Sequence, residues 1–187
     1  LDASYQGLTE SLTVTNTDND SNNLLISAIS NDTDETGATA TFTVSLDSAP
    51  TDDVTVTVAS DDTTEGTASP ATLTFTPGDW NVPQTVTVTG ADDDAVDGDI
   101  AYNIDLTASS TDLGYNGLSD SVALNNLDEG DTVGLVVGAI SGNTTESGGT
   151  ATFTVKLQSA PLANVLLTFS SDNTDEGTVD PVANFTA

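Results

Sequence analysis

One long stretch of this chain occurs twice, and that repeat limits the possible architectures more than any other feature. The segment 28–70 recurs as 139–181, with about 25 of the 43 aligned positions identical at an offset of 111 residues. A shorter match relates residues 5–8 to residues 115–118 just before an acidic run in each copy. The repeating unit is about 110 residues long, which is the size of a domain rather than of a solenoid repeat.

The repeat predicts three parts of the chain. Residues 1–20 match the C-terminal part of a preceding repeat, 21–131 form one complete unit, and 132–187 match the N-terminal part of a following repeat. Because the chain starts and stops inside repeats, we expect it to be a window onto a longer array. Tandem arrays of like domains are typical of stalks, adhesins and matrix proteins.

Period-two alternation of apolar and polar residues dominates the complete unit. From Ala40 to Leu46 the apolar side chains fall on one side and Thr or Ser on the other. This pattern is typical of strands with one buried face. It recurs at 54–58, 73–75, 86–88, 102–106 and 122–124. With 24–30 in front, about seven strands are expected, which predicts an all-β fold of tandem antiparallel immunoglobulin-like β-sandwiches.

The charge balance excludes several classes of function. The chain has 30 acidic residues, one basic residue (Lys156), no His and no Cys, for a net charge of −29. Nucleic acid requires basic residues to neutralise phosphates, so no nucleic-acid partner is expected. No apolar run reaches the ~18 residues of a membrane span, so no membrane insertion is expected. Without His, Cys or more than one Lys, the common nucleophilic mechanisms are ruled out, and we predict that the chain is not an enzyme.

The acids concentrate in the connections between predicted strands rather than on strand exteriors. Five of them lie between residues 92 and 99. Two carboxylates about 4 Å apart repel by about 1 kcal/mol in water and about 4 kcal/mol near a protein surface, so such a loop favours a bound cation. Ca²⁺ prefers oxygen ligands in a flexible geometry, whereas Zn²⁺ would need His or Cys. The alternative is a solvated acidic surface with diffuse counter-ions.

Several motifs follow one another in a recognisable order through the complete unit. They are Glu35-Thr36-Gly37, Glu65-Gly66-Thr67-Ala68, Pro77-Gly78, the run Asp92-Asp93-Asp94, Asp97-Gly98-Asp99 with Tyr102, and a final strand ending at Asp128. In this order and spacing the unit resembles a Calx-beta domain. The resemblance extends over both partial units and implies a sandwich that binds Ca²⁺ at one pole.

The resemblance also implies a ligand set. Its members by position are Glu65, Asp92, Asp93, Asp97, Asp128 and Asp131, with Asp94, Asp99 and Glu129 nearby and with Asp18, Asp20 and Glu176 in equivalent places of the partial units. One departure is Ser27, which stands where exchanger-type members carry a further acid. Because the terminal acids precede the next unit directly, Ca²⁺ is expected to stiffen the junctions between repeats.

These observations predict a calcium-binding structural repeat of a long extracellular adhesin, matrix or filament protein. The expected partners are calcium ions, neighbouring repeats of the same chain, and cell-surface or matrix components, at an extracellular or cell-surface location. Two alternatives remain open: a passive acidic spacer without specific ion sites, and a subunit that assembles itself into an extracellular filament.

Overall fold

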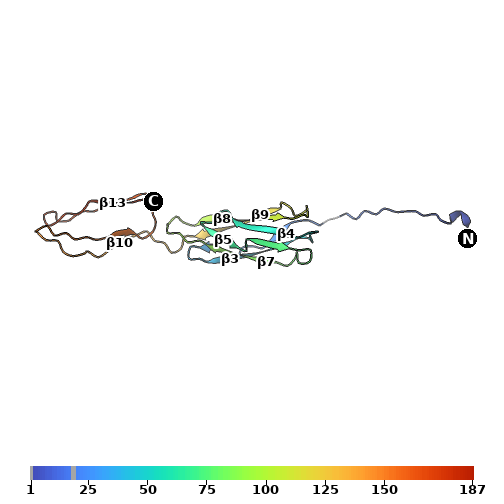
Figure 1. The fold of residues 1–187 in the computed structure, drawn as a ribbon, viewed down its shortest axis with the longest axis horizontal. Coiled ribbons are helices and arrows are strands. Elements are labelled where there is room, and N and C mark those ends of the chain that lie inside the picture. The colour runs from blue at the N-terminus through green and yellow to red at the C-terminus, as the bar shows by residue number, and fades with distance from the viewer. Residues whose placement is uncertain (1, 18–19) are drawn as a thin grey trace.

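A computed structural model describes residues 2–17 and 20–187, and three regions follow one another along its long axis (Figure 1). An extended N-terminal segment carries one short 3-10 helix, Ala3–Tyr5. A closed β-sandwich lies in the middle, and two separate strand pairs lie at the C-terminal end. The prediction of an all-β fold is confirmed. No helix of the described residues is long and apolar enough to span a bilayer.

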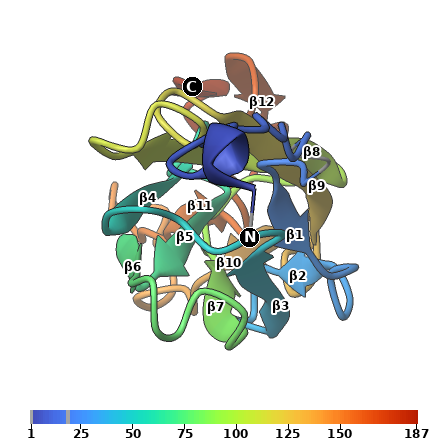
Figure 2. The same ribbon diagram turned by 90° about the vertical axis from the view of Figure 1, so that its right-hand side faces the viewer.

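The closed sandwich consists of two sheets that face each other (Figure 2). The four-stranded sheet has the order β1-β3-β7-β5, with bounds Leu24–Ile26, Thr39–Leu46, Gln84–Gly90 and Gly66–Ser69. The five-stranded sheet has the order β2-β9-β8-β4-β6, with bounds Thr33–Asp34, Ser119–Leu127, Ile100–Ser109, Val54–Ser60 and Thr72–Phe75. All neighbours are antiparallel except β2 and β9.

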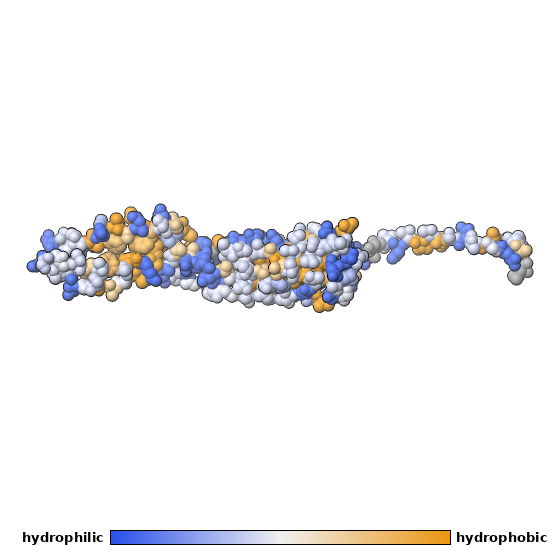
Figure 3. Space-filling view, viewed as in Figure 1, coloured by the Kyte–Doolittle hydropathy of each residue, from blue (hydrophilic) through white to orange (hydrophobic). Residues whose placement is uncertain are grey.

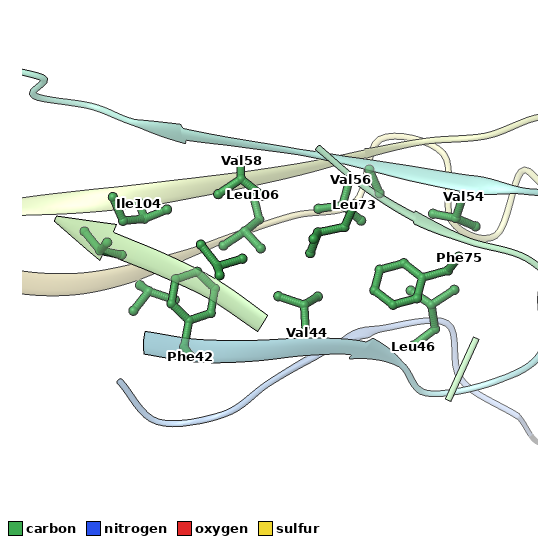
Figure 4. Close-up of a cluster of buried hydrophobic side chains, with 14 of the residues drawn as sticks. Phe42, Val44, Leu46, Val54, Val56, Val58, Leu73, Phe75, Ile104 and Leu106 are labelled. Carbon is green, nitrogen blue, oxygen red and sulfur yellow. The ribbon is translucent and has the colours of Figure 1, made fainter. Parts of the chain in front are cut away.

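The core lies where the period-two pattern placed it. In β3 the buried positions alternate with more exposed ones, and Phe42, Val44 and Leu46 point toward the side chains of β4 and β8 (Figure 4). Burial of each such side chain stabilises the fold by roughly 1.5–3 kcal/mol. The threonines between them face outward, because successive side chains of a strand point to opposite faces of the sheet.

Polar side chains close the two ends of this core. At the N-terminal pole the buried Tyr115 hydroxyl donates to Ser48 O over 2.7 Å and accepts from Ser48 N over 3.0 Å. At the opposite pole Thr33 Oγ1 lies 2.9 Å from Tyr102 Oη and 3.1 Å from Asn126 Oδ1. Every one of these side chains has a partner, as buried polar groups generally do.

The C-terminal strand pairs repeat the pairing of the complete unit. β10 (Leu135–Val137) pairs with β11 (Val155–Leu157) in the register of β1 with β3: Leu135 opposes Leu157 as Leu24 opposes Leu46. β12 (Val165–Thr168) pairs with β13 (Val182–Phe185) as β4 pairs with β6. The internal repeat is therefore a repeat of strand register as well as of sequence.

Only one closed sandwich is formed by the described residues. The two C-terminal pairs, which we call the half-sandwich (residues 132–187), carry no counterparts of β7, β8 and β9 among these residues. The structure therefore shows a β-sandwich but not the predicted tandem sandwiches. The complete unit also has nine strands rather than about seven. The additional strands β2 and β5 are short, and neither shows an alternating apolar pattern that could reveal it in the sequence.

Candidate functional site

The predicted acidic site forms at the pole of the closed sandwich that faces the half-sandwich, and Glu35 lies at its centre. Glu35 follows β2 and is 6% exposed, and its Oε2 has no hydrogen-bond partner among the described residues. Burial, followed by the negative charges of Asp128, Asp93, Asp131 and Asp97, raises the pKa of Glu35 to about 7. The side chain lies close to the acids of two other loop segments, 92–99 and 128–131, so its charged form is disfavoured.

Two further acids share this environment. Burial is the main cause that raises the pKa of Glu65, and nearby acids add to it, although a hydrogen bond with Asn126 acts in the opposite direction. Burial and the charges of Asp94, Asp92 and other acids raise the pKa of Asp131. The Oδ2 atom of Asp131 is buried without a hydrogen-bond partner among the described residues.

Backbone hydrogen bonds organise the loop between β7 and β8. Asp128 Oδ2 accepts from Gly98 N over 2.8 Å, and Asp99 Oδ1 accepts from Asp128 N over 3.3 Å. Asp93 Oδ1 accepts from Ala95 N over 2.6 Å. These contacts tie the loop 92–99 to the end of β9.

The structure brings together most of the residues of the predicted ligand set, but not all. Electrostatic coupling at this pole links Glu65, Asp92, Asp93, Asp94, Asp97, Asp128 and Asp131; Asp99 bonds to Asp128; and Glu129 is an exposed neighbour. Asp20 lies in the N-terminal segment and Glu176 in a turn of the half-sandwich, both outside this group. Asp18 is outside the described residues.

Sequence analysis did not include Glu35 in the ligand set. The available signal was the motif Glu35-Thr36-Gly37, which recurs as Glu146-Ser147-Gly148 at the entry of the same strand in the copy. Its burial could not be read from this motif, because it arises from loops that are remote in sequence.

The acidic pole shows no arranged metal centre among the described residues. Within residues 2–17 and 20–187, no group of three or more His, Cys, Asp or Glu side chains is placed to hold a metal ion. The calcium-binding character predicted from the loop acids is therefore contradicted. Ca²⁺ as a cofactor stays a prediction.

A second candidate site is the open face of the half-sandwich. Apolar residues, drawn in orange in Figure 3, gather on this region, whereas the closed sandwich shows more polar surface. Leu135, Phe153, Leu162 and Val182 are exposed in this region, and Phe153 is the equivalent of Phe42, which is buried in the complete unit. Exposed apolar patches of this kind commonly mark interaction sites.

The open face contains a cavity of about 520 Å³ between its two strand pairs. Leu135, Leu157, Val165 and Leu167 line it from β10, β11 and β12. A volume of this size falls within the range of ligand pockets, about 300–1,000 Å³, and such pockets are mostly apolar.

The closed sandwich contacts the half-sandwich at the edge of this cavity. Ala160 N donates to Asp94 O over 2.5 Å, and Ala95 and Ala160 form a parallel bridge. Val96, half-buried, lines the same cavity. The loop 92–99 is therefore a contact between the two units as well as part of the acidic pole.

Comparison with known proteins gives no match to a family model or to a curated protein. Similar solved structures are chaperones. The E. coli chaperone DraB is 12% identical with a TM-score of 0.43, covering 89% of this chain and 98% of that chain. The periplasmic chaperone SfaE is 7% identical with a TM-score of 0.40, covering 84% and 96%, and the class 5 fimbriae chaperone CfaA is 9% identical with a TM-score of 0.41, covering 88% and 80%. At these scores the likeness assigns no function to this chain.

These findings correct the predicted identity. The Calx-beta assignment is wrong, because no family model matches and the similar structures are chaperones. The predicted calcium-binding adhesin repeat, with its alternatives of passive spacer and self-assembling filament, is contradicted by the same comparison, as are calcium ions and same-chain repeats as partners. The resemblance misled because glycines, prolines and loop acids recur at similar spacings wherever short strands are joined by polar turns.

Proposed function

We propose that the open face of the half-sandwich binds an extended polypeptide segment as an added strand. One observation carries the proposal: β11 and β12 each have an edge without a partner strand among the described residues, and both edges border an apolar cavity. An unpaired edge offers a row of backbone donors and acceptors, and an extended peptide can add to it as a further strand.

The complete unit indicates what such a segment looks like. β7 pairs with β3 and places Val86 and Val88 on the core side, and β8 pairs with β4. By the same register, a bound strand would lie beside β12 and present alternate apolar side chains to Leu167. The expected ligand is therefore a strand-forming segment with apolar residues at every second position.

Charge narrows the choice of partner. With a net charge of −29 and Lys156 as its one basic residue, the chain repels acidic polypeptides and attracts basic ones. Binding is accordingly expected to be faster at low ionic strength.

In this proposal the chain binds a polypeptide and does not catalyse a reaction. Residues 132–187 are the first half of a second sandwich, and the bound strand extends it. We also propose that the chain is exported, which is less specific than the extracellular or cell-surface location predicted from the sequence. The similar structures are named as chaperones, a class of protein whose ligands are other polypeptides. A chaperone role falls within the proposal, which is supported by the open face itself.

The test is titration of the chain with a labelled peptide that has the sequence of residues 99–110, which includes β8. Because this peptide carries two acids and no base, the titration is done at about 0.15 M salt, which screens its repulsion by the chain. We expect saturable binding, together with slower amide exchange at 165–168. Leu167→Asp should abolish binding because it places a charge on the apolar face, whereas Thr168→Asp, on the exposed face of the same strand, should leave it unchanged. Equal binding of a scrambled peptide, or no protection at 165–168, would show that the edge does not accept a strand.

A further inference from the structure

The turn between β8 and β9, residues 112–118, carries the one Asn-Gly pair of the sequence, Asn116-Gly117. In such a pair the backbone nitrogen of the glycine attacks the side-chain amide carbon of the asparagine, because glycine has no Cβ to block the approach. The bond from Gly117 N to Asn116 Cγ forms, and the bond from Cγ to Nδ2 breaks. The amide nitrogen takes the glycine proton and leaves as ammonia. Water then opens the resulting succinimide ring to aspartate or isoaspartate.

Hydrogen bonds of the folded turn keep the reacting atoms apart. Gly117 N donates to Ala108 O over 2.9 Å, so the attacking nitrogen must first be released from β8. Asn116 Oδ1 accepts from Ser110 N over 3.3 Å, and Asn116 N donates to Asp112 O over 3.0 Å. The Asn116 side chain is exposed to water. The reaction is therefore restrained by the hydrogen bonds of the turn and not by burial of the asparagine.

Tyr115 fastens the same turn to the core of the closed sandwich. Its side chain is fully buried, and its hydroxyl donates to Ser48 O over 2.7 Å and accepts from Ser48 N over 3.0 Å. Ala108 N donates to Leu118 O over 2.8 Å on the far side of the turn. Release of Gly117 N requires this small region to open as a unit, and such local openings are rare in packed parts of a fold.

We propose that Asn116 is a spontaneous deamidation site controlled by the opening of the turn 112–118, and that its isoaspartate product prevents the turn from closing again. Isoaspartate adds one carbon to the main chain directly after Tyr115. Gly117 N then no longer matches Ala108 O while Tyr115 keeps its place in the core. The reaction thus loosens the N-terminal pole of the closed sandwich in one direction only. It is independent of strand binding at the open face.

The N-terminal segment contains a copy of this turn without the reactive pair. Gln6-Gly7 stands where the complete unit has Asn116-Gly117. The two glycines share one conformation, with φ of 83° at Gly7 and 85° at Gly117. Attack on glutamine must close a six-membered ring with one more rotatable bond, which is slower than closing the five-membered ring from asparagine. The chain therefore supplies its own control, a turn of the same type that should not react.

The experiment incubates the full chain at mildly alkaline pH, folded and in urea, beside a peptide with the sequence of residues 110–120. Peptide mapping by mass spectrometry follows the conversion of amide to carboxylate at each position. Asn116 should react at similar rates in the peptide and in urea, and on the order of 100-fold more slowly in the folded chain. Gln6 should stay unmodified throughout. Equal rates in the folded chain and the peptide would overturn control by the turn, and a peptide that does not react would overturn the site.

Amide exchange at Gly117 gives a second measure of the same opening. Exchange and deamidation both require release from Ala108 O, so folding should slow them by the same factor. Tyr115→Phe should accelerate both about tenfold, because it removes the hydrogen bonds to Ser48. Tyr5→Phe, the matched control in the exposed copy, should change neither. Deamidation that does not follow exchange across these variants would show that the reaction proceeds in the closed turn, which contradicts the proposal.

The purified isoaspartate form tests whether the product holds the turn open. Its midpoint of thermal unfolding should lie about 5 °C below that of the unmodified chain, because the turn loses hydrogen bonds. Asn116→Asp adds the same negative charge without the additional main-chain carbon, and its midpoint should lie close to that of the unmodified chain. An isoaspartate form with an unchanged midpoint, or an Asn116→Asp variant with the same decrease, would overturn loosening by the inserted carbon.

Discussion

The closed sandwich and the half-sandwich start from nearly the same sequence and the same strand registers, yet one buries its apolar face and the other exposes it. β3 and its equivalent segment, residues 150–157, show this: Phe42 is 1% exposed, whereas the equivalent Phe153 is 40% exposed. The difference does not lie in these strands but in what covers them, namely β7, β8 and β9. Alternation in a strand determines which face is apolar, and only neighbouring strands determine whether that face is buried.

The two regions also differ at the loop between β3 and β4 and at its equivalent between β11 and β12. The complete unit has Thr51-Asp52-Asp53 where the half-sandwich has Leu162-Ala163-Asn164. The apolar version lies beside Val96 of the preceding unit, across the bridge between Ala95 and Ala160. The polar version faces the side of the N-terminal segment, where it bonds to Asp112. The loop beside Val96 is therefore apolar, and the equivalent loop beside the N-terminal segment is acidic.

A pair of matched core substitutions tests this difference between the two regions with the largest expected effect. Phe42→Ala should destabilise the closed sandwich by about 3–5 kcal/mol, because it leaves a cavity in a packed core. Phe153→Ala should cost about 1 kcal/mol, because this ring is 40% exposed and packs edge-to-face against Phe169 at a centroid distance of 5.8 Å. Urea unfolding of the two variants measures both costs. Equal losses would mean that the half-sandwich has a closed core in solution.

A second pair concerns glycines at equivalent positions. Gly66→Ala should cost about 1–3 kcal/mol, because a Cβ there would collide with the ring and hydroxyl of Tyr102. Gly177→Ala, the control, meets nothing within 4 Å and should be neutral or slightly stabilising, since alanine restricts the unfolded chain. Thermal unfolding distinguishes the two. A Gly66→Ala variant with unchanged stability would show that Tyr102 does not pack against β5.

How much of the structure the sequence alone predicts depends on whether the interactions are local or join residues that are distant in sequence. Alternation in 40–46 and 54–58 correctly predicted β3, β4 and their buried faces, because this signal is local. The short β2 and the burial of Glu35 could not be predicted, since both depend on loops and strands distant in sequence. The clustering of Asp93, Asp97, Asp128 and Asp131 could be predicted, because their loops lie at the same pole of the sandwich. Whether they converge on an ion did not follow, because loop spacing does not fix where carboxylates point.

A third pair tests the tyrosine turns. Tyr115→Phe should destabilise the chain by about 1–2 kcal/mol, because it leaves the backbone N–H of Ser48 without its partner inside the protein. Tyr5→Phe should have no effect on unfolding, since Tyr5 is 73% exposed in the N-terminal segment. Calorimetry of both variants is sufficient. A large effect of Tyr5→Phe would place that residue in a packed environment and contradict its exposed position.

The smallest expected effect separates the two glutamates at equivalent positions by their pH dependence. The pKa of Glu35 is raised to about 7 from an ordinary value of 4.5, so the folded state binds more protons than the unfolded state between these values. Its ionisation destabilises the fold, and stability should rise by about 1 kcal/mol as pH falls from 8 to 5, with solvent and salt screening part of the full effect. Glu35→Gln should flatten this dependence and raise stability at pH 8, whereas Glu146→Gln, at the exposed equivalent position, should change neither. Unfolding midpoints across this range measure the effect, and a Glu35→Gln variant with an unaltered pH profile would show that Glu35 stays accessible to water.

Below about pH 4 the trend should reverse, because hydrogen bonds lower the pKa of Asp61, Asp79 and Asp112, and protonating these groups costs stability.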